Sequence, residues 1–281
     1  MTGKVEFVSV PWDERALDIE YQWIGVANEA APLLVFLHEG LGSLAMWRDF
    51  PERLCRAAGC RGLVYSRPGY GRSTARAKDE NWDVDFMHRQ AYALLPALLD
   101  RLDVDSETRP PWLFGHSDGG SIALLYAAAY PRRVAGIIVI APHIMVEELS
   151  VKSIEQARVA YLQTDLRERL GRYHADPDSA FWGWNDIWLL PQFRGWSIED
   201  EIGDIRCPLL AVQGVNDEYG TLEQVHGIAR RVKQAEIIEL RDCGHSPHRD
   251  QAQRLIDAST RFLESNTVGT FSDETGFYAQ Y

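Results

Sequence analysis

A Gly-x-Ser-x-Gly pattern that joins an apolar segment to a helical one constrains the fold of this chain most. Residues 111–114 are apolar, Gly115, Ser117 and Gly119 form the pattern, and the helical segment continues to Ala129. This order is typical of a buried strand, a sharp turn and a helix. A serine at such a turn has strained backbone, and its neighbours two places away must be small so that strand and helix can pass closely. The helix N-terminus favours developing negative charge, so Ser117 is predicted to be a nucleophile.

Strand and helix patterns alternate on both sides of this turn. Strands are predicted at residues 32–37, 62–65, 134–140, 208–213 and 236–240, and the uninterrupted apolar run at 32–37 is typical of a strand buried on both faces. Helices are expected at 46–58, 84–102, 221–232 and 249–263, the second of them kinked at Pro96. Two earlier runs, 5–10 and 17–25, alternate apolar and polar residues and predict an antiparallel edge. The fold class is therefore α/β, with a mostly parallel central sheet flanked by helices.

The alternation stops between residues 143 and 203, after the sixth predicted strand, where the pattern is helical only. This segment carries four tryptophans and two phenylalanines: Phe181, Trp182, Trp184, Trp188, Phe193 and Trp196. A helical insertion of this kind is expected to cover the carboxyl end of the sheet, where ligands of open α/β folds bind. We expect a core of residues 1–142 and 204–265, a cap of residues 143–203, and a C-terminal tail of residues 266–281 outside the core.

The composition limits the possible partners. The 281 residues include 29 Lys and Arg against 41 Asp and Glu, a formal net charge of −12. This charge repels phosphates, so we expect neither nucleic acid nor a membrane as partner, but a small-molecule substrate. The N-terminus lacks the apolar core of a signal peptide, which makes the cytoplasm the expected location. The four cysteines form no CxxC pair, and His245 and His248 lack the further ligands that a metal site needs.

A serine hydroxyl needs a base, because it is a weak nucleophile at neutral pH. Histidine titrates in the right pH range, and the chain has eight histidines. His245 directly follows the last predicted strand, in a loop at the carboxyl end of the sheet. His116 adjoins Ser117 in sequence but is expected to point in another direction. The sequence therefore predicts His245 as the base.

The base in turn needs an acid that holds its tautomer and stabilises its imidazolium form. Asp217 and Glu218 both lie in the loop after the predicted strand 208–213. We favour Asp217, because its spacing from Gly214 is the one that such acids usually have. A simple surface turn is the alternative interpretation, since Asp is also a common turn residue.

Two backbone N–H groups are expected to stabilise the oxyanion that forms on the attacked carbonyl. The first belongs to Asp118, directly after Ser117. The second is expected from the loop after strand 32–37, where glycines let the backbone approach a substrate closely. Gly40 is the predicted donor and Leu41 the alternative.

Together these segments resemble the α/β-hydrolase fold superfamily, in its serine hydrolase branch with a helical cap. The resemblance covers residues 15–264 and rests on five motifs in the family's order: Leu-His-Glu-Gly-Leu-Gly at 37–42, Ser-Arg-Pro-Gly-Tyr-Gly-Arg-Ser at 66–73, Gly-His-Ser-Asp-Gly-Gly at 115–120, the Asp217 loop, and Gly-His-Ser-Pro at 244–247. It implies the chain order serine, aspartate, histidine for Ser117, Asp217 and His245.

Two residues depart from the family's pattern. Many relatives have glycine where Glu39 stands, and the residue after the nucleophile is often apolar or glutamine where Asp118 stands. Both carboxylates would lie near the predicted oxyanion. We expect Asp118 to complement the helix dipole and Glu39 to fix its loop by a hydrogen bond. The alternative is that one of them contacts a cationic or hydroxylated substrate or orients a water.

The resemblance implies hydrolysis through an acyl-enzyme. Relatives that act on haloalkanes or epoxides carry aspartate at the position of Ser117, which argues against those reactions. We expect a small, apolar or aromatic carboxylic ester or lactone as substrate. Carbon–carbon bond hydrolysis, cofactor-free perhydrolysis and small-molecule sensing stay open as alternatives. No cofactor is expected, because the chemistry needs none and no dinucleotide fingerprint follows the first strand.

Overall fold

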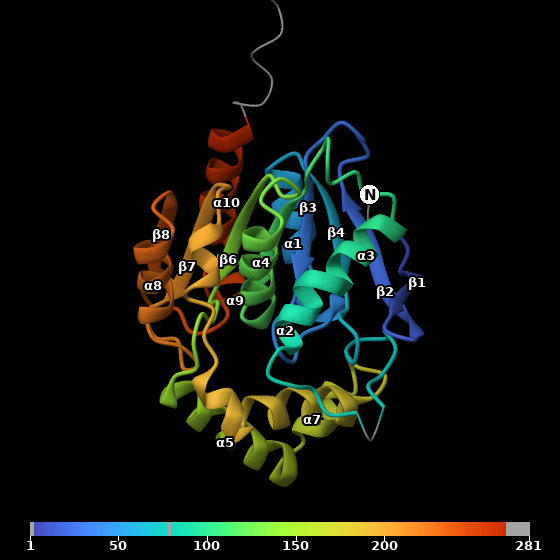
Figure 1. Cartoon of the computed structure of the whole chain (residues 1–281), viewed down its shortest axis with the longest axis vertical. Coiled ribbons are helices and arrows are strands. Elements are labelled where there is room, and N and C mark those ends of the chain that lie inside the picture. The colour runs from blue at the N-terminus through green and yellow to red at the C-terminus, as the bar shows by residue number, and fades with distance from the viewer. Residues whose placement is uncertain (1–2, 78–79, 268–281) are drawn as a thin grey trace, which may run out of the picture.

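The described residues form one eight-stranded sheet with helices on both faces (Figure 1). The computed structural model describes residues 3–77 and 80–267. The strands are β1 (Glu6–Trp12), β2 (Arg15–Gly25), β3 (Leu33–Leu37), β4 (Arg61–Tyr65), β5 (Trp112–His116), β6 (Gly136–Ile140), β7 (Leu209–Gly214) and β8 (Ala235–Leu240). Their order in the sheet is β1-β2-β4-β3-β5-β6-β7-β8. The first two strands pair antiparallel, as does β2 with β4, and all other pairs are parallel. The predicted fold class is thus confirmed.

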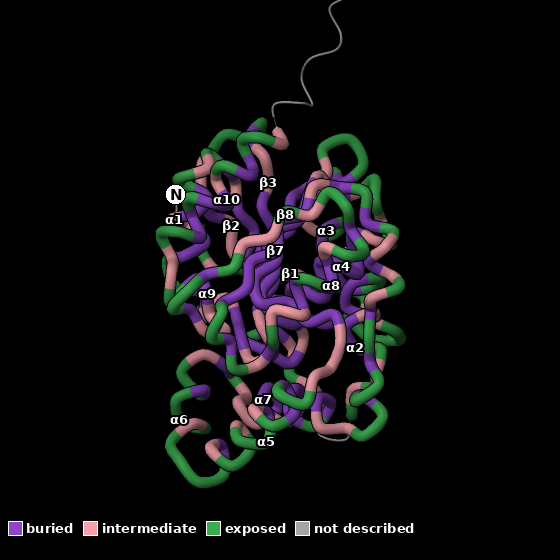
Figure 2. Tube along the Cα trace, turned by 90° about the vertical axis from the view of Figure 1, so that its left-hand side faces the viewer, coloured by how far each residue is buried: buried purple, intermediate pink, exposed green. Residues whose placement is uncertain are grey.

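The central strands are apolar at successive positions because each face of the sheet packs against its own hydrophobic core. On β3, Val35 belongs to one core and the adjacent Phe36 to the other, because successive side chains point to opposite faces. The first core lies under α2 (Phe86–Arg89), α3 (Leu95–Arg101), α4 (Asp118–Ala129) and α8 (Glu223–Arg231). The second lies under α1 (Phe50–Ala57) and α10 (Ala252–Thr267), which pack on each other. The inner strands form the buried centre of the molecule (Figure 2).

The register of the central strands sets the position of the functional loops. Leu37 at the end of β3 pairs with Gly115 on β5, and Gly115 pairs in turn with Val139 on β6. The carboxyl ends of three neighbouring strands are therefore level. The loops that carry Glu39 and Ser117 consequently begin side by side, although they lie far apart in sequence.

The helix expected at 84–102 is broken earlier than predicted. A π-helical turn (Gln90–Leu94) separates α2 from α3, so the irregularity precedes Pro96. The proline lacks the N–H that would bond the carbonyl of Tyr92 four residues before it. That carbonyl instead accepts a hydrogen bond from the Tyr130 hydroxyl at 2.8 Å.

Two other expected helices also differ from the prediction. The helix at 46–58 is a 3₁₀ turn (Leu44–Trp47) followed by α1, because Arg48 between them has a φ of +55°. The helix at 249–263 is a short α9 (Pro247–Asp250) followed by α10, which continues to Thr267. Residues 266 and 267, expected to begin the tail, belong to α10, and the Thr267 hydroxyl donates to the Leu263 carbonyl at 2.6 Å. Residues 268–281 of that tail lie outside the described residues.

The segment between β6 and β7 is helical, as expected. It contains α5 (Glu148–Gln163), α6 (Leu166–Leu170) and α7 (Pro177–Trp188), followed by two 3₁₀ turns (Pro191–Gly195 and Glu201–Asp204). Figure 1 shows α5 and α7 lying across one end of the sheet. The buried core under α4 continues into this segment through Trp188 and Phe193. Within the described ranges, no helix is both long and apolar enough to cross a membrane.

Candidate active site

Ser117 occupies the sharp turn between β5 and α4, with a φ of +52°. A non-glycine residue rarely adopts this conformation, so the surroundings must hold it there. Glycines at positions 115 and 119 let strand β5 and helix α4 pass close to each other at this turn. A Cβ on Gly119 would come within 2.1 Å of the Leu37 carbonyl oxygen, and one on Gly115 within 2.3 Å of the Gly119 oxygen. Only glycine permits this close passage of strand and helix.

Three side chains predicted from separate parts of the sequence meet at this turn. The Ser117 hydroxyl lies 3.0 Å from Nε2 of His245. Nδ1 of the same imidazole lies 2.9 Å from both carboxylate oxygens of Asp217. A carboxylate only accepts, so Nδ1 carries the hydrogen and the lone pair of Nε2 faces the serine. Asp217 is itself fixed by the Gln213 amide at 2.6 Å and the Tyr219 backbone N–H at 2.8 Å.

The electrostatics of the pair suit proton transfer. Burial lowers the pKa of His245, but the hydrogen bond and the charge of Asp217 outweigh burial and raise that pKa above its usual value. Burial raises the pKa of Asp217, but the hydrogen bond and charge of His245 outweigh it and lower the pKa. The aspartate is therefore ionised wherever the histidine titrates.

The competing residues face elsewhere. Glu218, the alternative acid, accepts the backbone N–H of His245 at 3.2 Å and does not touch the imidazole nitrogens. His116 points its Nε2 at the backbone oxygen of His245, 2.7 Å away, as the sequence analysis expected of a residue that is not the base of Ser117.

The loop after β3 holds one peptide plane in a fixed orientation. The carbonyl oxygen of Glu39 accepts three hydrogen bonds, from His38 Nδ1 at 2.7 Å, Arg67 Nη2 at 2.8 Å and the Gly42 N–H at 3.0 Å. His38 can donate from Nδ1 because its Nε2 accepts the Arg67 backbone N–H. In a trans peptide the next N–H points the opposite way. The N–H of Gly40 is thus directed away from buried Arg67, and Gly40 borders the pocket.

Asp118 faces the protein interior. Its Oδ2 lies 3.6 Å from Arg67 Nη2, with side-chain exposures of 1% and 0%, and its Oδ1 accepts the indole N–H of Trp188 at 3.2 Å. Burial raises the pKa of Asp118, while Arg67 and Trp188 counteract that rise. The expectation that this carboxylate complements the helix dipole left out Arg67. The one signal for Arg67 in the sequence was its place in the 66–73 motif.

A pocket with about 550 Å³ of empty space, part of it open to solvent, begins at Ser117 and His245. Gly40 and Leu41 border it on one side. Its apolar wall comes largely from the segment between β6 and β7, through Ile154, Trp184 and Trp188.

The other aromatic residues of that segment hold it together. Trp182 packs on Tyr161 and Phe181, while Trp196 stacks on Phe193 with ring centroids 5.2 Å apart. The four tryptophans and two phenylalanines therefore divide between lining the pocket and packing, and sequence spacing alone could not assign them.

His143 lines the same pocket and was missed by the sequence analysis. Its ring centroid lies 5.8 Å from that of His245, and burial lowers its pKa to about 3, so it is neutral. A signal existed, because His143 follows the end of β6 in a loop at the same end of the sheet as His245.

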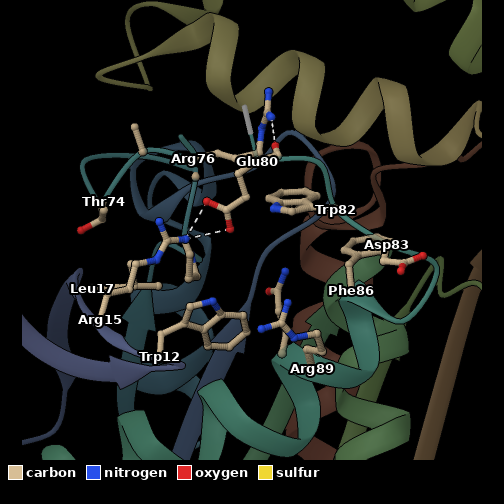
Figure 3. Close-up of a pocket in the computed structure, with 14 residues that line it drawn as sticks. Trp12, Arg15, Leu17, Thr74, Arg76, Glu80, Trp82, Asp83, Phe86 and Arg89 are labelled. Carbon is tan, nitrogen blue, oxygen red and sulfur yellow. Dashed lines mark hydrogen bonds and ion pairs between the residues drawn. The ribbon is translucent and has the colours of Figure 1, made fainter. Parts of the chain in front are cut away.

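A second pocket of about 520 Å³ lies between β1, β2 and the loop that precedes α2 (Figure 3). Trp12 and Trp82 border it, and an ion pair between Arg15 and Glu80 at 2.6 Å spans its edge. It contains neither Ser117 nor His245, so the chemistry discussed below belongs to the first pocket. In the described ranges, no group of three or more His, Cys, Asp and Glu side chains is arranged to hold a metal ion.

The chain is similar to several known proteins. The sequence profile of the alpha/beta hydrolase family matches residues 34–258. The sn-1-specific diacylglycerol lipase ABHD11 of Mus musculus is 26% identical over 286 residues, covering 89% of this chain and 87% of the relative. The 2-hydroxy-6-oxo-6-phenylhexa-2,4-dienoate hydrolase of Burkholderia cepacia is 22% identical and covers 82% and 87%. The crystal structure of the enol-lactonase from Burkholderia xenovorans LB400 superposes with a TM-score of 0.71 at 20% identity, covering 92% of this chain and all of that one.

Proposed function

The chain belongs to the alpha/beta hydrolase family, and from this premise we propose that it is a serine hydrolase of a small carboxylic ester or lactone. The observation that carries the proposal is the continuous contact from Ser117 through His245 to Asp217. By their names, the proteins compared above are a diacylglycerol lipase, a dienoate hydrolase and an enol-lactonase. The reaction type must therefore be argued from the pocket.

In the proposed reaction, the Ser117 oxygen attacks the substrate carbonyl while His245 Nε2 takes the hydroxyl proton. Asp217 stabilises the imidazolium that results. The tetrahedral intermediate then expels the alcohol, which leaves with that proton, and an acyl-serine ester remains. Water attacks this ester with His245 again as base, which releases the acid and restores the serine.

The backbone N–H groups of Gly40 and Asp118 stabilise the oxyanion in this proposal. The three hydrogen bonds on the Glu39 carbonyl support the role of Gly40, because they fix the peptide plane before substrate arrives. Donors that need not reorganise during the reaction lower its barrier most. Asp118 begins α4, so its N–H also has the positive end of the helix dipole behind it.

The pocket walls support a substrate with an apolar or aromatic part. Trp184, Trp188, Ile154 and Leu41 offer ring faces and aliphatic surface beside Ser117. Residues 143–203 act as a cap in this proposal, because α5 and α7 supply part of that wall and lie over the end of the sheet. A polymer would not fit beneath them, which favours a small molecule.

The test is an activity screen with p-nitrophenyl esters, aryl lactones and amides, run on the wild type and on Ser117→Ala. We expect ester or lactone turnover that falls by about 10⁴-fold or more in the variant. A fluorophosphonate probe should label the wild type and Ser246→Ala, but not Ser117→Ala. Retained turnover in Ser117→Ala would reject the assignment, and so would a large ligand-induced thermal shift without any turnover, which indicates a sensor.

A carbon–carbon bond hydrolase is the second candidate, favoured by the likeness to the Burkholderia cepacia dienoate hydrolase. The same three side chains would serve that reaction. Turnover of a 2-hydroxy-6-oxo-dienoate, with esters of similar size left intact, would replace the first proposal by this one. Peroxide-dependent halogenation in acetate would identify a perhydrolase instead.

A further inference from the structure

The buried imidazole of His116, which the proposed reaction does not use, contacts two loops of the site. His116 closes β5 and is 1% exposed. Its Nε2 lies 2.7 Å from the backbone oxygen of His245, in the loop after β8. Its Nδ1 lies 3.4 Å from Oε2 of Glu39, in the loop after β3. His116, the residue before the nucleophile, therefore contacts both the loop of the proposed base His245 and the loop of the proposed oxyanion donor Gly40.

The two contacts dictate where protons sit on the ring. A carbonyl oxygen can only accept, so Nε2 of His116 carries a hydrogen. In a neutral imidazole the other nitrogen would then present its lone pair to the Glu39 carboxylate. Two acceptors facing each other in a buried place repel, and a proton on Nδ1 turns this repulsion into attraction.

The surroundings favour this charged arrangement. Burial raises the pKa of Glu39, but the neighbouring His116 ring outweighs burial and holds that pKa well below its usual range. Arg249 Nη2 lies 3.8 Å from the other oxygen of Glu39, so the carboxylate also faces a guanidinium group. From α9, the His248 ring lies 4.9 Å from that of His116, and its pKa is lowered to about 2 by burial and by His116. His248 is therefore neutral and does not compete for the carboxylate.

The other titratable groups near His116 are His245, Asp217 and His38. The His245 ring lies 5.2 Å from that of His116, and Asp217 holds the proton on its far nitrogen. His38, on the β3 side, is neutral, because burial lowers its pKa well below the usual value. None of these groups supplies a second counterion to His116.

We propose that doubly protonated His116 and ionised Glu39 form a positioning ion pair that holds the His245 backbone, and with it the imidazole, at its place beside Ser117. The inference rests on the proposed function, since it assigns a role in the same site. It gives Glu39 a purpose inside the protein, with its carboxylate committed to His116 and Arg249 rather than to substrate.

The decisive measurement is the protonation state of His116 in the wild-type protein. In ¹⁵N-labelled protein at pH 7, long-range ¹H–¹⁵N spectra should show both His116 nitrogens protonated, assigned by loss of those signals in His116→Asn. In Glu39→Gln the amide N–H can donate to Nδ1, so the ring should become singly protonated. A singly protonated His116 in the wild type would overturn the proposal. Because the spectrum is recorded on the wild-type protein, this test needs no substrate and does not depend on whether a variant folds.

Kinetics test the positioning role. Glu39→Leu should lower kcat by about 10- to 100-fold with a smaller change in KM, because misplacing the base weakens the chemical step more than binding. Glu39→Gln should restore part of kcat, since it restores a hydrogen bond to His116. Unchanged kcat in Glu39→Leu would overturn the role. Failure of the proposed function looks different, because Ser117→Ala would then keep wild-type turnover.

Discussion

Arg67 and Asp118 form a fully buried ion pair directly behind Ser117. The guanidinium lies 3.6 Å from the carboxylate, and it donates at 2.8 Å to the Glu39 carbonyl that orients the N–H of Gly40. One cation thus contacts Glu39, which precedes the proposed donor Gly40, and the side chain of Asp118, whose N–H is the other proposed donor. A buried charge needs a partner of opposite sign, which explains why an acid can stand directly after the serine.

Asp118→Asn should destabilise the protein by about 3–5 kcal/mol, because it leaves the Arg67 charge buried without a counterion. The free energy of unfolding in urea measures this loss. Asp186→Asn is the matched control, since it breaks an exposed pair with Arg158, with side-chain exposures of 44% for Arg158 and 52% for Asp186, and should cost less than about 1 kcal/mol. Equal losses in the two variants would contradict this account of Asp118.

The parts of the molecule that local sequence determines could be predicted. Apolar runs marked the buried strands because both faces of β3 and β5 are covered, and the glycines around Ser117 marked the turn because a Cβ would clash there. Ser117, His245 and Asp217 were named from their loops alone. Their catalytic roles stay predictions until the variants are assayed.

Tertiary partners could not be predicted in the same way. The purposes of Glu39 and Asp118 depend on His116 and Arg67, which reach them from other loops. The sequence contains many arginines, and nothing in its periodicity says which one becomes buried. The break before Pro96 was also misplaced, because it depends on how the chain adjusts around a missing N–H.

The pH dependence of activity should report His245. The base must be neutral to accept the serine proton, so kcat/KM should rise with pH through a pKa above that of an ordinary histidine, as Asp217 raises it. Asp217→Asn should move this limb to lower pH and reduce kcat by about 10⁴-fold. Glu218→Gln, next in sequence, should shift the limb less. A larger effect of Glu218→Gln would make that residue the acid.

Acid should destabilise the protein through His248, whose pKa is lowered to about 2 by burial and by the nearby charge of His116. Its unfolded-state pKa is higher, about 6.5, so its contribution is fully present above that pH and is lost as pH falls toward 2. Each pH unit in this range costs up to about 1.4 kcal/mol. Urea unfolding of His248→Leu between pH 7 and 5 should show a shallower loss than the wild type. Parallel losses would contradict the burial of a neutral ring.

Gly119→Ala should prevent stable folding, because its Cβ would come within 2.1 Å of the backbone oxygen of Leu37 on β3. Neither backbone can move without breaking the central sheet. Gly195→Ala is the control, since its Cβ would meet nothing within 4 Å. Thermal unfolding should separate the two by several kcal/mol, beyond the cost of typical substitutions. A cooperative transition near the wild-type temperature in Gly119→Ala would show that the turn can relax.

Gly40→Ala tests the proposed oxyanion donor and the cap together. An added Cβ would lie 2.3 Å from Cδ1 and Nε1 of Trp184 on α7, so either the indole or the loop must move. The indole is 6% exposed and packs on Phe181, so we expect the loop to move and the Gly40 N–H to leave its position. Loss of one oxyanion donor lowers kcat by about 10²-fold or more.

Trp184→Leu removes the obstructing ring atoms, so Gly40→Ala combined with Trp184→Leu should have a higher kcat than Gly40→Ala alone. Such non-additivity, measured in a double-mutant cycle with Trp184→Leu as the second single variant, would locate the effect in this contact. Wild-type kcat in Gly40→Ala would instead remove Gly40 from the oxyanion site and leave Leu41 as the donor to test.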